Sequence, residues 1–446
     1  MAIWAGIVAG CETIPAQLDG WNDPARSGRY GIVTGVAHLE KRRLERIVVV
    51  GASLAGLRAC ETLRTEGYRG AITLIGDEQH LPYDRPPLSK KLLAGEWEPD
   101  RIVLRKPDAI DELGLDVRLG QRAAGLDMDD RAIELDDGTS VPFDGVVLAT
   151  GSRTRRLPGQ DAVPEVCELR TLDDSLALRE LISDGAARVV VIGAGFIGLE
   201  VAATAHSLGC PVTVLEAAEA PLIRGLGVEM GRATTSIHEG LEIRCGVLVE
   251  ELRADGVGLA GGEQVPADVI VVGIGVTPAT DWLANSGLEL RDGVVCDATL
   301  RAGPPGVYAA GDLARWPNQL FGEEMRLEHW TNAAEQGAAA ARNLLITAAG
   351  GTPHPYAPVP FFWSDQAPHR IQFLGHGGAD DDVEVVVGTP ETGRFLALFG
   401  RHGRLRGALG VNAPRLVMPY RVLLAERRTW VDALALASEQ RHAQQT

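Results

Sequence analysis

Two uninterrupted runs of β-branched residues, each followed by a glycine turn, stand out in the hydrophobic pattern of the chain. The first run covers residues 46–50, and a helical stretch to Glu66 and a second apolar run over residues 71–75 follow it. Runs that are apolar at every position are typical of parallel strands buried on both faces. The same succession returns about 142 residues later, with strands expected over residues 188–192 and 212–215. The pattern therefore predicts two separate β-α-β units.

Further short apolar strands, each ending at glycine, are expected over residues 146–151, 269–275 and 307–312. From about residue 353 the chain changes to prolines followed by aromatic and β-rich segments, and a closing helix is expected over residues 430–438. The fold class indicated is α/β, with two Rossmann-like dinucleotide-binding domains and a C-terminal α+β domain.

The glycine turn of the second unit has the full G-x-G-x-x-G spacing, at Gly193, Gly195 and Gly198. Glycine lets the backbone approach a pyrophosphate at a helix N-terminus, where free N–H groups and the helix dipole favour an anion. Glu216 follows about 23 positions after Gly193. Its carboxylate would accept hydrogen bonds from a ribose diol and repel a 2′-phosphate, so NADH is favoured over NADPH. Arg224 nearby would soften that preference.

The turn of the first unit departs from this spacing, because Ser53 stands between Gly51 and Gly56 where the middle glycine is expected. Serine is small enough to preserve the close approach of a ligand, so this unit is also interpreted as a dinucleotide site, with Asp77 as the ribose partner. The alternative is a Rossmann-like unit that binds no ligand.

Charge and cysteine content narrow the choice of partners and compartment. The net charge of −17 over 446 residues disfavours nucleic acid and anionic membranes as general partners. None of the six cysteines forms a C-x-x-C pair, so neither a zinc knuckle nor a local redox dithiol is expected. Scattered thiols indicate a reducing cytoplasm, and no apolar run reaches the roughly 18 residues that span a bilayer. We expect a cytoplasmic protein without a metal site.

The first 44 residues are expected to form a poorly ordered extension, because they are rich in glycine and small side chains. Residues 8–11 (Val-Ala-Gly-Cys) loosely resemble a lipoprotein cleavage box, but no Lys or Arg precedes them, which argues against a membrane anchor. A translation start near Val33 or Val36, just before the basic run at residues 41–43, is a further alternative.

Five motifs occur in order: Y-D-R-P-P-L-S-K at residues 83–90, A-T-G at 149–151, Y-A-A-G-D at 308–312, E-H-W-T-N at 328–332 and F-F-W-S-D-Q at 361–366. Together they resemble the FAD-dependent ferredoxin reductases of bacterial oxygenase systems, of the putidaredoxin reductase and aromatic-ring dioxygenase type. The resemblance covers about residues 45–400, and residues 1–44 have no counterpart in it.

The resemblance implies a glutathione-reductase-like division into domains. The FAD-binding domain would be discontinuous, over residues 45–155 and 277–345. The NAD-binding domain would cover residues 156–276, and a C-terminal reductase domain would cover residues 346–446.

The resemblance also implies two sets of binding residues. Those for FAD are Gly51, Ser53, Ala55, Gly56, Asp77, Arg85, Lys90, Ala123, Thr150, Gly151, Arg153, Gly311, Asp312 and Trp330. Those for NADH are Gly193, Gly195, Phe196, Ile197, Gly198, Glu200, Glu216, Arg224 and Gly275. In the first set, Asp312 would bond the ribityl chain and Trp330 would lie near the flavin ring.

Lys90, Glu200 and Trp330 are the candidate catalytic residues, and the resemblance suggests a buried Lys90–Glu200 pair beside the flavin. Each residue has a plainer interpretation. Lys90 would be a solvated loop lysine, Glu200 a surface acid and Trp330 a core side chain. Asp312 would similarly be the N-cap of the helical segment after it.

The implied function is transfer of a hydride from NADH to non-covalent FAD and then of single electrons to a [2Fe–2S] ferredoxin that serves a mono- or dioxygenase. The ferredoxin would dock on a local basic surface, and the protein would be a monomer or homodimer. Dithiol reductases and single-cysteine peroxidases are disfavoured, because Leu88-Ser89-Lys90 occupies the early loop and no cysteine pair exists. A rubredoxin reductase, an NADH:small-molecule reductase and a redox-sensing flavoprotein of the apoptosis-inducing-factor kind remain alternatives.

Overall fold

The structure, a computed structural model, describes residues 44–445 except residue 379. The extension expected over residues 1–44 therefore lies outside the described residues apart from Leu44. Within the described part of the chain, no helix is both long enough and apolar enough to cross a membrane.

The first β-α-β unit contributes to a five-stranded parallel sheet, ordered β19-β7-β1-β2-β3. Its strands are β1 (Arg46–Val50), β2 (Ala71–Ile75), β3 (Asp116–Arg118), β7 (Gly145–Leu148) and β19 (Val307–Ala309). Strand β19 comes from a segment that follows the whole second unit, so the sheet is assembled from two distant parts of the sequence. The first strand pairs with the second on one side and the fourth on the other, the order typical of Rossmann folds.

The second unit repeats this arrangement in a sheet ordered β12-β11-β10-β16-β9. Its strands are β9 (Val166–Cys167), β10 (Val189–Ile192), β11 (Val212–Glu216), β12 (Glu242–Cys245) and β16 (Val269–Val272). The central strands of both sheets are buried at every position after the first residue, as expected for strands covered on both faces. The predicted fold class is thus confirmed.

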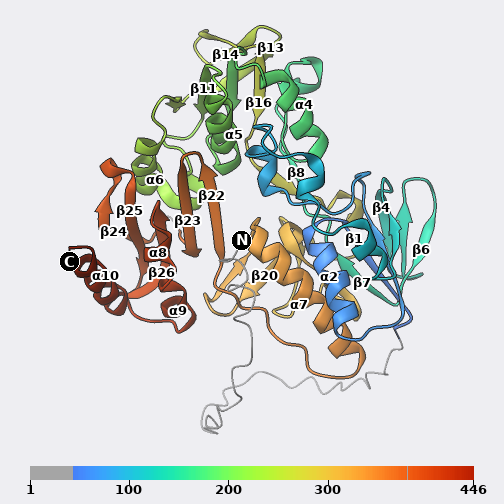
Figure 1. Ribbon diagram of the computed structural model, residues 1–446. Coiled ribbons are helices and arrows are strands. Elements are labelled where there is room, and N and C mark those ends of the chain that lie inside the picture. Colours follow the sequence, from blue (N-terminus) through green and yellow to red (C-terminus); the bar gives the residue numbers. More distant parts are fainter. Residues whose placement is uncertain (1–43, 379, 446) are drawn as a thin grey trace. The chain divides into compact units, whose positions relative to one another are not determined.

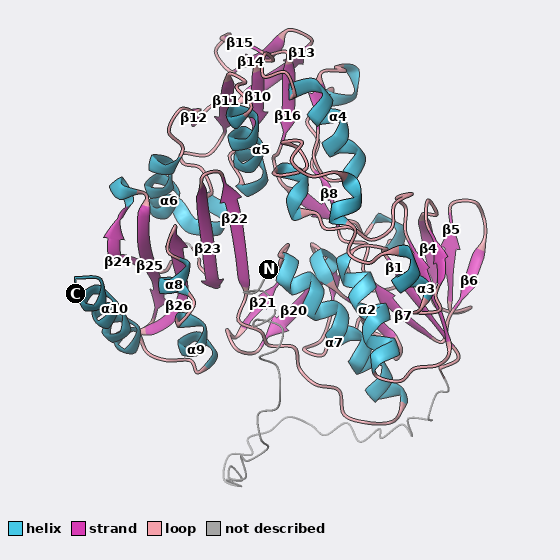
Figure 2. Cartoon of the chain, viewed as in Figure 1, coloured by secondary structure: helices cyan, strands magenta, loops and turns pink. Residues whose placement is uncertain are grey.

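The third sheet is antiparallel and is ordered β22-β23-β26-β25-β24 (Figure 2). It comprises β22 (Phe361–Gln366), β23 (His369–Gly375), β24 (Asp382–Thr389), β25 (Arg394–Arg401) and β26 (Arg404–Val411). Three helices complete this region: α8 (Pro414–Val417), α9 (Tyr420–Ala425) and α10 (Trp430–Gln445). The sequence prediction ended the last helix too early, because its final turns are polar and lack apolar periodicity although they contain good helix formers.

The two parallel sheets are connected by a pair of adjacent chain segments. Strand β8 (Ser152–Thr154) leaves the first sheet, and β17 (Val276–Pro278) returns from the second. They pair antiparallel, with Arg153 opposite Thr277. Residues just before and after these crossings are therefore held close together although they are far apart in the sequence.

The remaining elements are short or lie outside the three large sheets. The strands are β4 (Ala123–Asp127), β5 (Ala132–Leu135), β6 (Ser140–Pro142), β13 (Val249–Arg253), β14 (Gly256–Leu259), β15 (Gln264–Pro266), β18 (Val294–Val295), β20 (Ala314–Asn318) and β21 (Glu323–Met325). The helices are α2 (Leu54–Thr65), α3 (Pro107–Asp111), α4 (Leu172–Ile182), α5 (Phe196–Ser207), α6 (Ile223–Thr234) and α7 (Trp330–Ala348).

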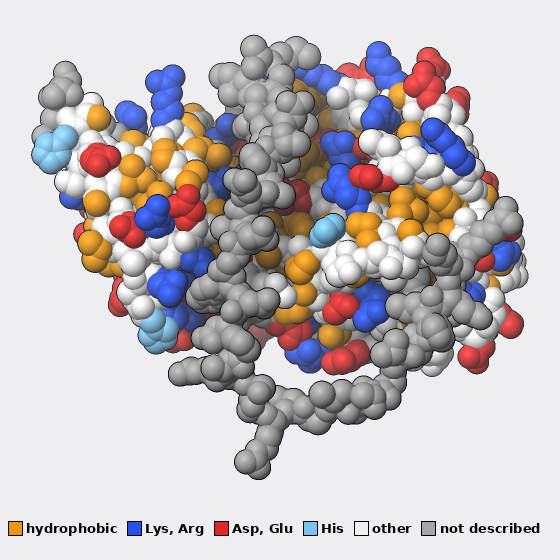
Figure 3. All heavy atoms as spheres, turned by 90° about the horizontal axis from the view of Figure 1, so that it is seen from below, with side chains coloured by type: hydrophobic (Ala, Val, Ile, Leu, Met, Phe, Trp, Pro, Cys, Tyr) orange, Lys and Arg blue, Asp and Glu red, His pale blue; other side chains and the backbone are white. Residues whose placement is uncertain are grey.

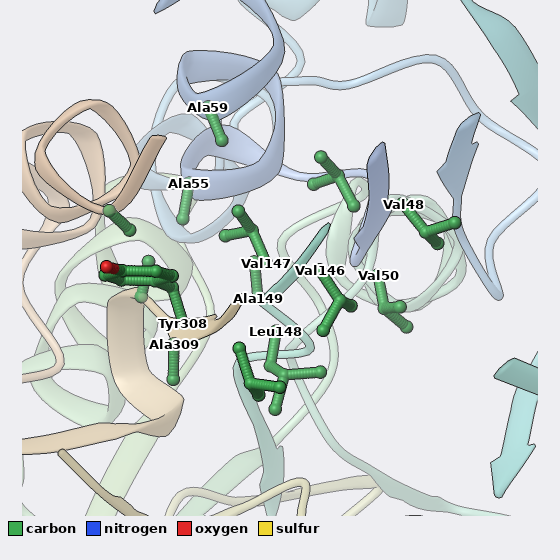
Figure 4. Packing of buried hydrophobic residues seen from close by; sticks show 14 of the residues in the cluster. Val48, Val50, Ala55, Ala59, Val146, Val147, Leu148, Ala149, Tyr308 and Ala309 are labelled. Atoms are coloured by element: carbon green, nitrogen blue, oxygen red, sulfur yellow. The ribbon is translucent and has the colours of Figure 1, made fainter. Parts of the chain in front are cut away.

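The core around the first sheet joins its strands to helices α2 and α7, which run side by side (Figure 1). Figure 4 shows Val48 and Val147 of the strands packed in the same cluster as Ala55 and Ala59 of α2. The helices approach closely, because a Cβ atom at Gly337 of α7 would lie 2.2 Å from the Ala55 carbonyl oxygen. This packing fixes the start of α2, where the first glycine turn lies.

Charged side chains of both signs are interspersed on the face drawn in Figure 3. Elsewhere on the described surface, charged side chains pair with each other, for example Arg188 with Asp268 at 2.6 Å and Arg244 with Glu263 at 2.6 Å. Exposed pairs of this kind each contribute only about 0–1 kcal/mol to stability, so the parallel sheets and their cores carry the fold.

Candidate functional site

Both glycine turns lie at the carboxyl end of the first strand of a β-α-β unit. The turn at residues 51–56 follows β1 and leads into α2, and the turn at residues 193–198 follows β10 and leads into α5. Doubly wound α/β folds bind their ligands in the crevice at this end of the strands.

The turn at residues 193–198 leaves space for a ligand at one position only. A Cβ atom at Gly193, which has φ +103°, would lie 2.5 Å from the Gly273 carbonyl oxygen, and one at Gly198 would lie 2.2 Å from the Gly193 carbonyl oxygen. No atom lies within 4 Å of the same position on Gly195. The outer glycines are therefore required by the chain's own backbone, whereas the middle glycine keeps open a place that a pyrophosphate can approach.

The turn at residues 51–56 has the same geometry. A Cβ atom at Gly51, with φ +119°, would lie 2.1 Å from the Ala149 carbonyl oxygen, and one at Gly56 would lie 1.9 Å from the Gly51 carbonyl oxygen. Ser53 takes the middle position with φ −119°, which any residue adopts, and its hydroxyl makes no cap bond to α2. Serine is thus tolerated here, and both turns fit the pyrophosphate of a dinucleotide.

The acidic residues expected at the ribose rings lie at the ends of the second strands. Glu216 ends β11, and its carboxylate accepts hydrogen bonds from the backbone nitrogens of Ala194, at 2.7 Å, and Ala218, at 2.9 Å. The carboxylate is thereby fixed against the glycine turn. Asp77 follows β2 and is exposed. The ribose roles of both residues remain predictions.

Other expected binding residues also come together in space. The segment that leads to Ala123 lies along the end of β2, since the backbone nitrogen of Gln121 donates to the Gly76 carbonyl at 2.9 Å. The guanidinium of Arg224 lies against Gly275, with Nη1 2.6 Å from the place of a Cβ atom there. The structure therefore brings Ala123 near the Asp77 turn and Arg224 to Gly275, as expected if each pair lines one cofactor.

A polar cluster surrounds Asp312, which is the second residue of a short 3-10 helix over Gly311–Leu313. Its Oδ2 accepts from Ser152 Oγ at 2.7 Å and from Arg170 Nη2 at 3.0 Å. Arg85 donates to the Arg170 carbonyl and to Glu78 Oε1, the latter at 2.6 Å. The N-cap of the 3-10 helix is Ala310. The interpretation of Asp312 as an N-cap was therefore wrong.

Sequence reasoning missed Ser152, Arg170 and Glu78, which hold Asp312 and Arg85 in place. Glu78 stands next to the predicted Asp77, and Ser152 next to the predicted Gly151, so proximity along the chain was the available signal for both. Arg170 offered no such signal. It is brought to Asp312 by the return of the chain between the two sheets.

Thr150 and Arg153 lie at the same crossing but make different contacts. Thr150 Oγ1 donates to the Ala279 carbonyl at 3.0 Å. Arg153 pairs with Asp281 at 2.6 Å, and the two side chains are 42% and 79% exposed. Arg153 is thus bonded to an exposed acid rather than to the Asp312 cluster.

Lys90 and Glu200 form a buried ion pair. The distance from Lys90 Nζ to Glu200 Oε2 is 2.5 Å, and the side chains are 16% and 6% exposed. Lys90 Nζ also donates to the Pro86 carbonyl at 2.9 Å. The interpretations as a solvated lysine and as a surface acid were therefore wrong. The pair joins the loop before the first unit's β3 to the helix that follows the second glycine turn.

Trp330 begins helix α7, and its indole Nε1 donates to Asp84 Oδ1 at 2.6 Å. Its ring meets that of Trp363 edge to face, with centroids 6.1 Å apart. Burial raises the pKa of Asp84, while the bond from Trp330 and the charge of Lys90 act in the opposite direction. Trp330 is therefore tied to the loop that carries Lys90 and is not simply a core side chain.

Aromatic contacts connect the two sets of predicted residues. The ring of Phe196 meets that of Phe362 with centroids 4.9 Å apart, and the ring of His329 lies 4.9 Å from the same Phe362. His329 directly precedes Trp330. Ile197 is 45% exposed, so part of its apolar surface is accessible to a ligand.

The described residues include free thiols and no cluster of potential metal ligands. The cysteines there are free, and burial raises the pKa of the Cys60 thiol to about 12, which disfavours a reactive thiolate. No described group of three or more His, Cys, Asp or Glu side chains is arranged to hold a metal ion.

Comparison with known proteins places this architecture in a family. Residues 45–337 match the family model described as pyridine nucleotide-disulphide oxidoreductase, and residues 361–444 match the reductase C-terminal model. Rhodocoxin reductase of Rhodococcus erythropolis is 37% identical over 387 residues, which cover 85% of this chain and 89% of that protein.

Two further relatives agree. The ferredoxin–NAD(+) reductase component of the anthranilate 1,2-dioxygenase system of Burkholderia cepacia is 39% identical over 386 residues, covering 85% of this chain and 93% of that protein. The crystal structure of the covalent putidaredoxin reductase–putidaredoxin complex aligns with a TM-score of 0.81 at 30% identity, covering 90% of this chain and 99% of that one. The chain therefore belongs to the pyridine nucleotide-disulphide oxidoreductase family, in its branch of NAD-linked ferredoxin reductases.

Proposed function

We propose that this protein is an FAD-dependent NADH:ferredoxin reductase that delivers electrons to a [2Fe–2S] ferredoxin of an oxygenase system. The observation that carries the proposal is the Lys90–Glu200 pair, which joins a loop of the first dinucleotide unit to the helix that starts at the second glycine turn. FAD, when bound, accepts a hydride from NADH and releases the electrons singly, which is chemistry that no side chain supplies.

The residues of the first unit fit a bound FAD. The turn at residues 51–56 would hold the pyrophosphate at the start of α2, where the helix dipole favours an anion. Arg85 lies beside that turn, since its Nε is 3.4 Å from Ser53 Oγ. Glu78 and the Arg170 carbonyl hold Arg85 in place, so its charge would be oriented toward the phosphates before the cofactor binds.

The residues of the second unit fit NADH. Gly195 keeps the approach to α5 open, and Ile197 and Phe196 present apolar surface at the first turn of that helix. Glu200 lies one turn further along and reaches Lys90. The nicotinamide would thus be placed between the helix and the loop of residues 83–90, with water excluded by apolar side chains.

The carboxylate of Glu216 accounts for a preference for NADH over NADPH. It is held at the end of β11 by two backbone N–H groups, so it cannot easily move away from a 2′-phosphate. The guanidinium of Arg224 lies against Gly275, and no described hydrogen bond joins it to this carboxylate. A 2′-phosphate would meet a negative charge that is fixed in position.

The identity of the acceptor rests on the relatives. Two of them are named as reductases of rhodocoxin or of a ferredoxin, and a third is captured in a covalent complex with putidaredoxin. The chain covers nearly the full length of each relative, including the C-terminal sheet. We therefore infer that the electron acceptor of this protein is a small electron-transfer protein.

Cytochrome c reduction by NADH tests this proposal, with the FAD-loaded protein assayed in the presence and absence of a [2Fe–2S] ferredoxin. Many-fold stimulation by the ferredoxin, above the rates with oxygen or cytochrome alone, supports an electron-transfer reductase. Rapid reduction of the flavin without any stimulation would instead indicate an NADH oxidase, a small-molecule reductase or a sensor.

A further inference from the structure

The carboxylate of Glu200 accepts hydrogen bonds from three side chains. Ser364 Oγ donates to Oε1 at 2.6 Å, and Ser89 Oγ and Lys90 Nζ donate to Oε2 at 2.5 Å each. Ser364 and Ser89 are 0% and 4% exposed, so neither hydroxyl can turn to water instead. A carboxylate surrounded in this way has a single available orientation.

The bond from Ser364 continues into a buried chain of polar groups. Gln366 Nε2 donates to Ser364 Oγ at 3.1 Å, and Gln366 Oε1 lies 2.5 Å from His238 Nε2. Gln366 and His238 are 1% and 6% exposed. Burial lowers the pKa of His238, which favours the neutral ring with one N–H group.

The donor and acceptor at each step of this chain follow from the carboxylate. Glu200, paired with Lys90, can only accept, so the hydroxyl proton of Ser364 must point toward it. Ser364 must then receive its own hydrogen bond from the amide N–H of Gln366. The Gln366 oxygen therefore faces His238, whose single proton must lie on Nε2.

The backbone places these residues together from three distant segments. Ser364 and Gln366 are two positions apart on β22, so they point to the same face of the strand. That strand packs against helix α5, which carries Glu200 (Figure 1). His238 follows the 3-10 turn after α6. Glu200, Ser364 and Gln366 are thus supplied by a helix and a strand, and His238 directly follows a 3-10 turn.

We propose that Ser364, Gln366 and His238 are positioning residues that fix the Glu200 carboxylate and, through it, the ammonium group of Lys90. Ser364 and Gln366 would act on Lys90 from the C-terminal sheet, and His238 would act from the turn after α6. The inference deepens the proposed function, because it assumes that Lys90 works at the cofactor site.

The chain is well suited to a direct test, because it contains only four lysines: Lys41, Lys90, Lys91 and Lys106. Reductive methylation with formaldehyde and a borane, followed by tandem mass spectrometry, measures the reactivity of each amine. Lys91 is the internal reference. It adjoins Lys90 in the sequence, but its side chain is 53% exposed and its Nζ lies 3.9 Å from Glu96 Oε2. The labelling needs neither NADH nor ferredoxin and is done on the FAD-loaded protein.

Ser364→Ala is expected to raise the Lys90:Lys91 labelling ratio several-fold and to slow reduction of the flavin by NADH several-fold. Gln366→Met, which leaves the serine in place, is expected to raise the ratio less. Ser364→Thr keeps the hydroxyl and should retain most of the wild-type ratio. The matched control is Ser286→Ala, which removes another buried serine hydroxyl, one that bonds the Leu283 carbonyl instead.

An unchanged ratio in both Ser364→Ala and Gln366→Met, in protein that retains its flavin and unfolds at the wild-type temperature, would overturn the inference. So would an equal change in Ser286→Ala. If Ser364→Ala does not fold, Gln366→Met decides. A changed ratio in a protein that fails to reduce ferredoxin would instead contradict the proposed function while leaving the positioning role intact.

Discussion

The indole Nε1 of Trp330 donates to Asp84 Oδ1 over 2.6 Å and joins two residues that are 246 positions apart. The bond anchors the first residue of α7 to the loop that carries Lys90. Burial raises the pKa of Asp84, so the charged form of this carboxylate is disfavoured in the folded protein. The hydrogen bond therefore stabilises the fold, whereas the buried charge of the ionised acid opposes it.

Substitution of Asp84 separates these two contributions. Asp84→Asn keeps the acceptor without a buried charge, whereas Asp84→Ala removes the acceptor and leaves the indole N–H without its partner, at a cost of about 1–3 kcal/mol. The pKa of Asp84 is higher in the folded protein than in the unfolded chain. The stability of the wild-type protein therefore falls as the pH rises from the unfolded pKa to the folded one. Urea unfolding at neutral pH should rank Asp84→Asn at or above wild type and Asp84→Ala below it. Equal stability of the two variants would contradict the role of the bond.

Removing Lys90 should cost more than removing any other lysine that the structure describes. Lys90→Met leaves Glu200 buried without its cation, which typically destabilises by about 3–5 kcal/mol. The double variant Lys90→Met, Glu200→Gln should recover part of that loss, because no uncompensated charge remains. The free energy of unfolding measures both effects. Lys91→Met is the matched control, since the Lys91 side chain is 53% exposed. A loss of unfolding free energy in Lys91→Met as large as that in Lys90→Met would contradict the prediction.

The two kinds of glycine in the second turn predict opposite phenotypes. Gly195→Ala meets no atom within 4 Å, so the protein should unfold at the wild-type temperature but bind NADH about tenfold or more weakly, a difference of about 1.4 kcal/mol. Gly198→Ala would place its Cβ 2.2 Å from the Gly193 carbonyl oxygen, so it should destabilise the domain itself. Titration of NADH and thermal unfolding distinguish the outcomes. Wild-type NADH affinity in a folded Gly195→Ala protein would exclude a phosphate from this turn.

Glu216→Gln tests the basis of cofactor preference. The amide keeps the size of the side chain but removes the negative charge, so the ratio of kcat/KM for NADH to that for NADPH should fall several-fold. Most of the change should come from improved use of NADPH, because the repulsion of a 2′-phosphate is lost. Glu219→Gln, which lies nearby in an exposed ion pair with Arg232, provides the control. An unaltered ratio in Glu216→Gln would place the selectivity elsewhere.

Acid should destabilise the protein partly through His329. Burial lowers the pKa of His329 to about 4, below that of an unfolded histidine. The unfolded chain then binds more protons than the folded one between about pH 6.5 and 4, so stability falls as the pH falls through this window, by up to about 1.4 kcal/mol per unit. His329→Asn lacks this titrating group. The difference between its unfolding free energy and that of the wild type should therefore change with pH in this window, by up to about 1.4 kcal/mol per pH unit. Parallel curves for the two proteins would show that His329 is not responsible.

The elements that depend on local pattern were predictable from the sequence. The strands of residues 46–50 and 71–75 occur as expected, because strands buried on both faces are apolar at every position. The glycine turns were also predictable from the sequence, because a positive φ or a close backbone contact at a position leaves few residues other than glycine possible there. The two outer glycines of each turn are required by backbone atoms of the protein itself.

The side-chain networks were not predictable in the same way. The pairing of Lys90 with Glu200 came from family resemblance, and the bonds of Ser364, Gln366 and His238 were not foreseen. These residues come from four separate segments, and no spacing along the chain indicates that they meet. Arg170 illustrates the same point, because only the fold brings it to Asp312.

Anaerobic rapid mixing of NADH with the FAD-loaded protein and a [2Fe–2S] ferredoxin shows whether electrons pass from NADH through the flavin to the ferredoxin. Flavin absorbance should fall first, ferredoxin absorbance should then fall at a catalytically competent rate, and two ferredoxins should be reduced for each NADH consumed. Fast reduction of the flavin with no reduction of any oxygenase ferredoxin would show that the protein is not a ferredoxin reductase.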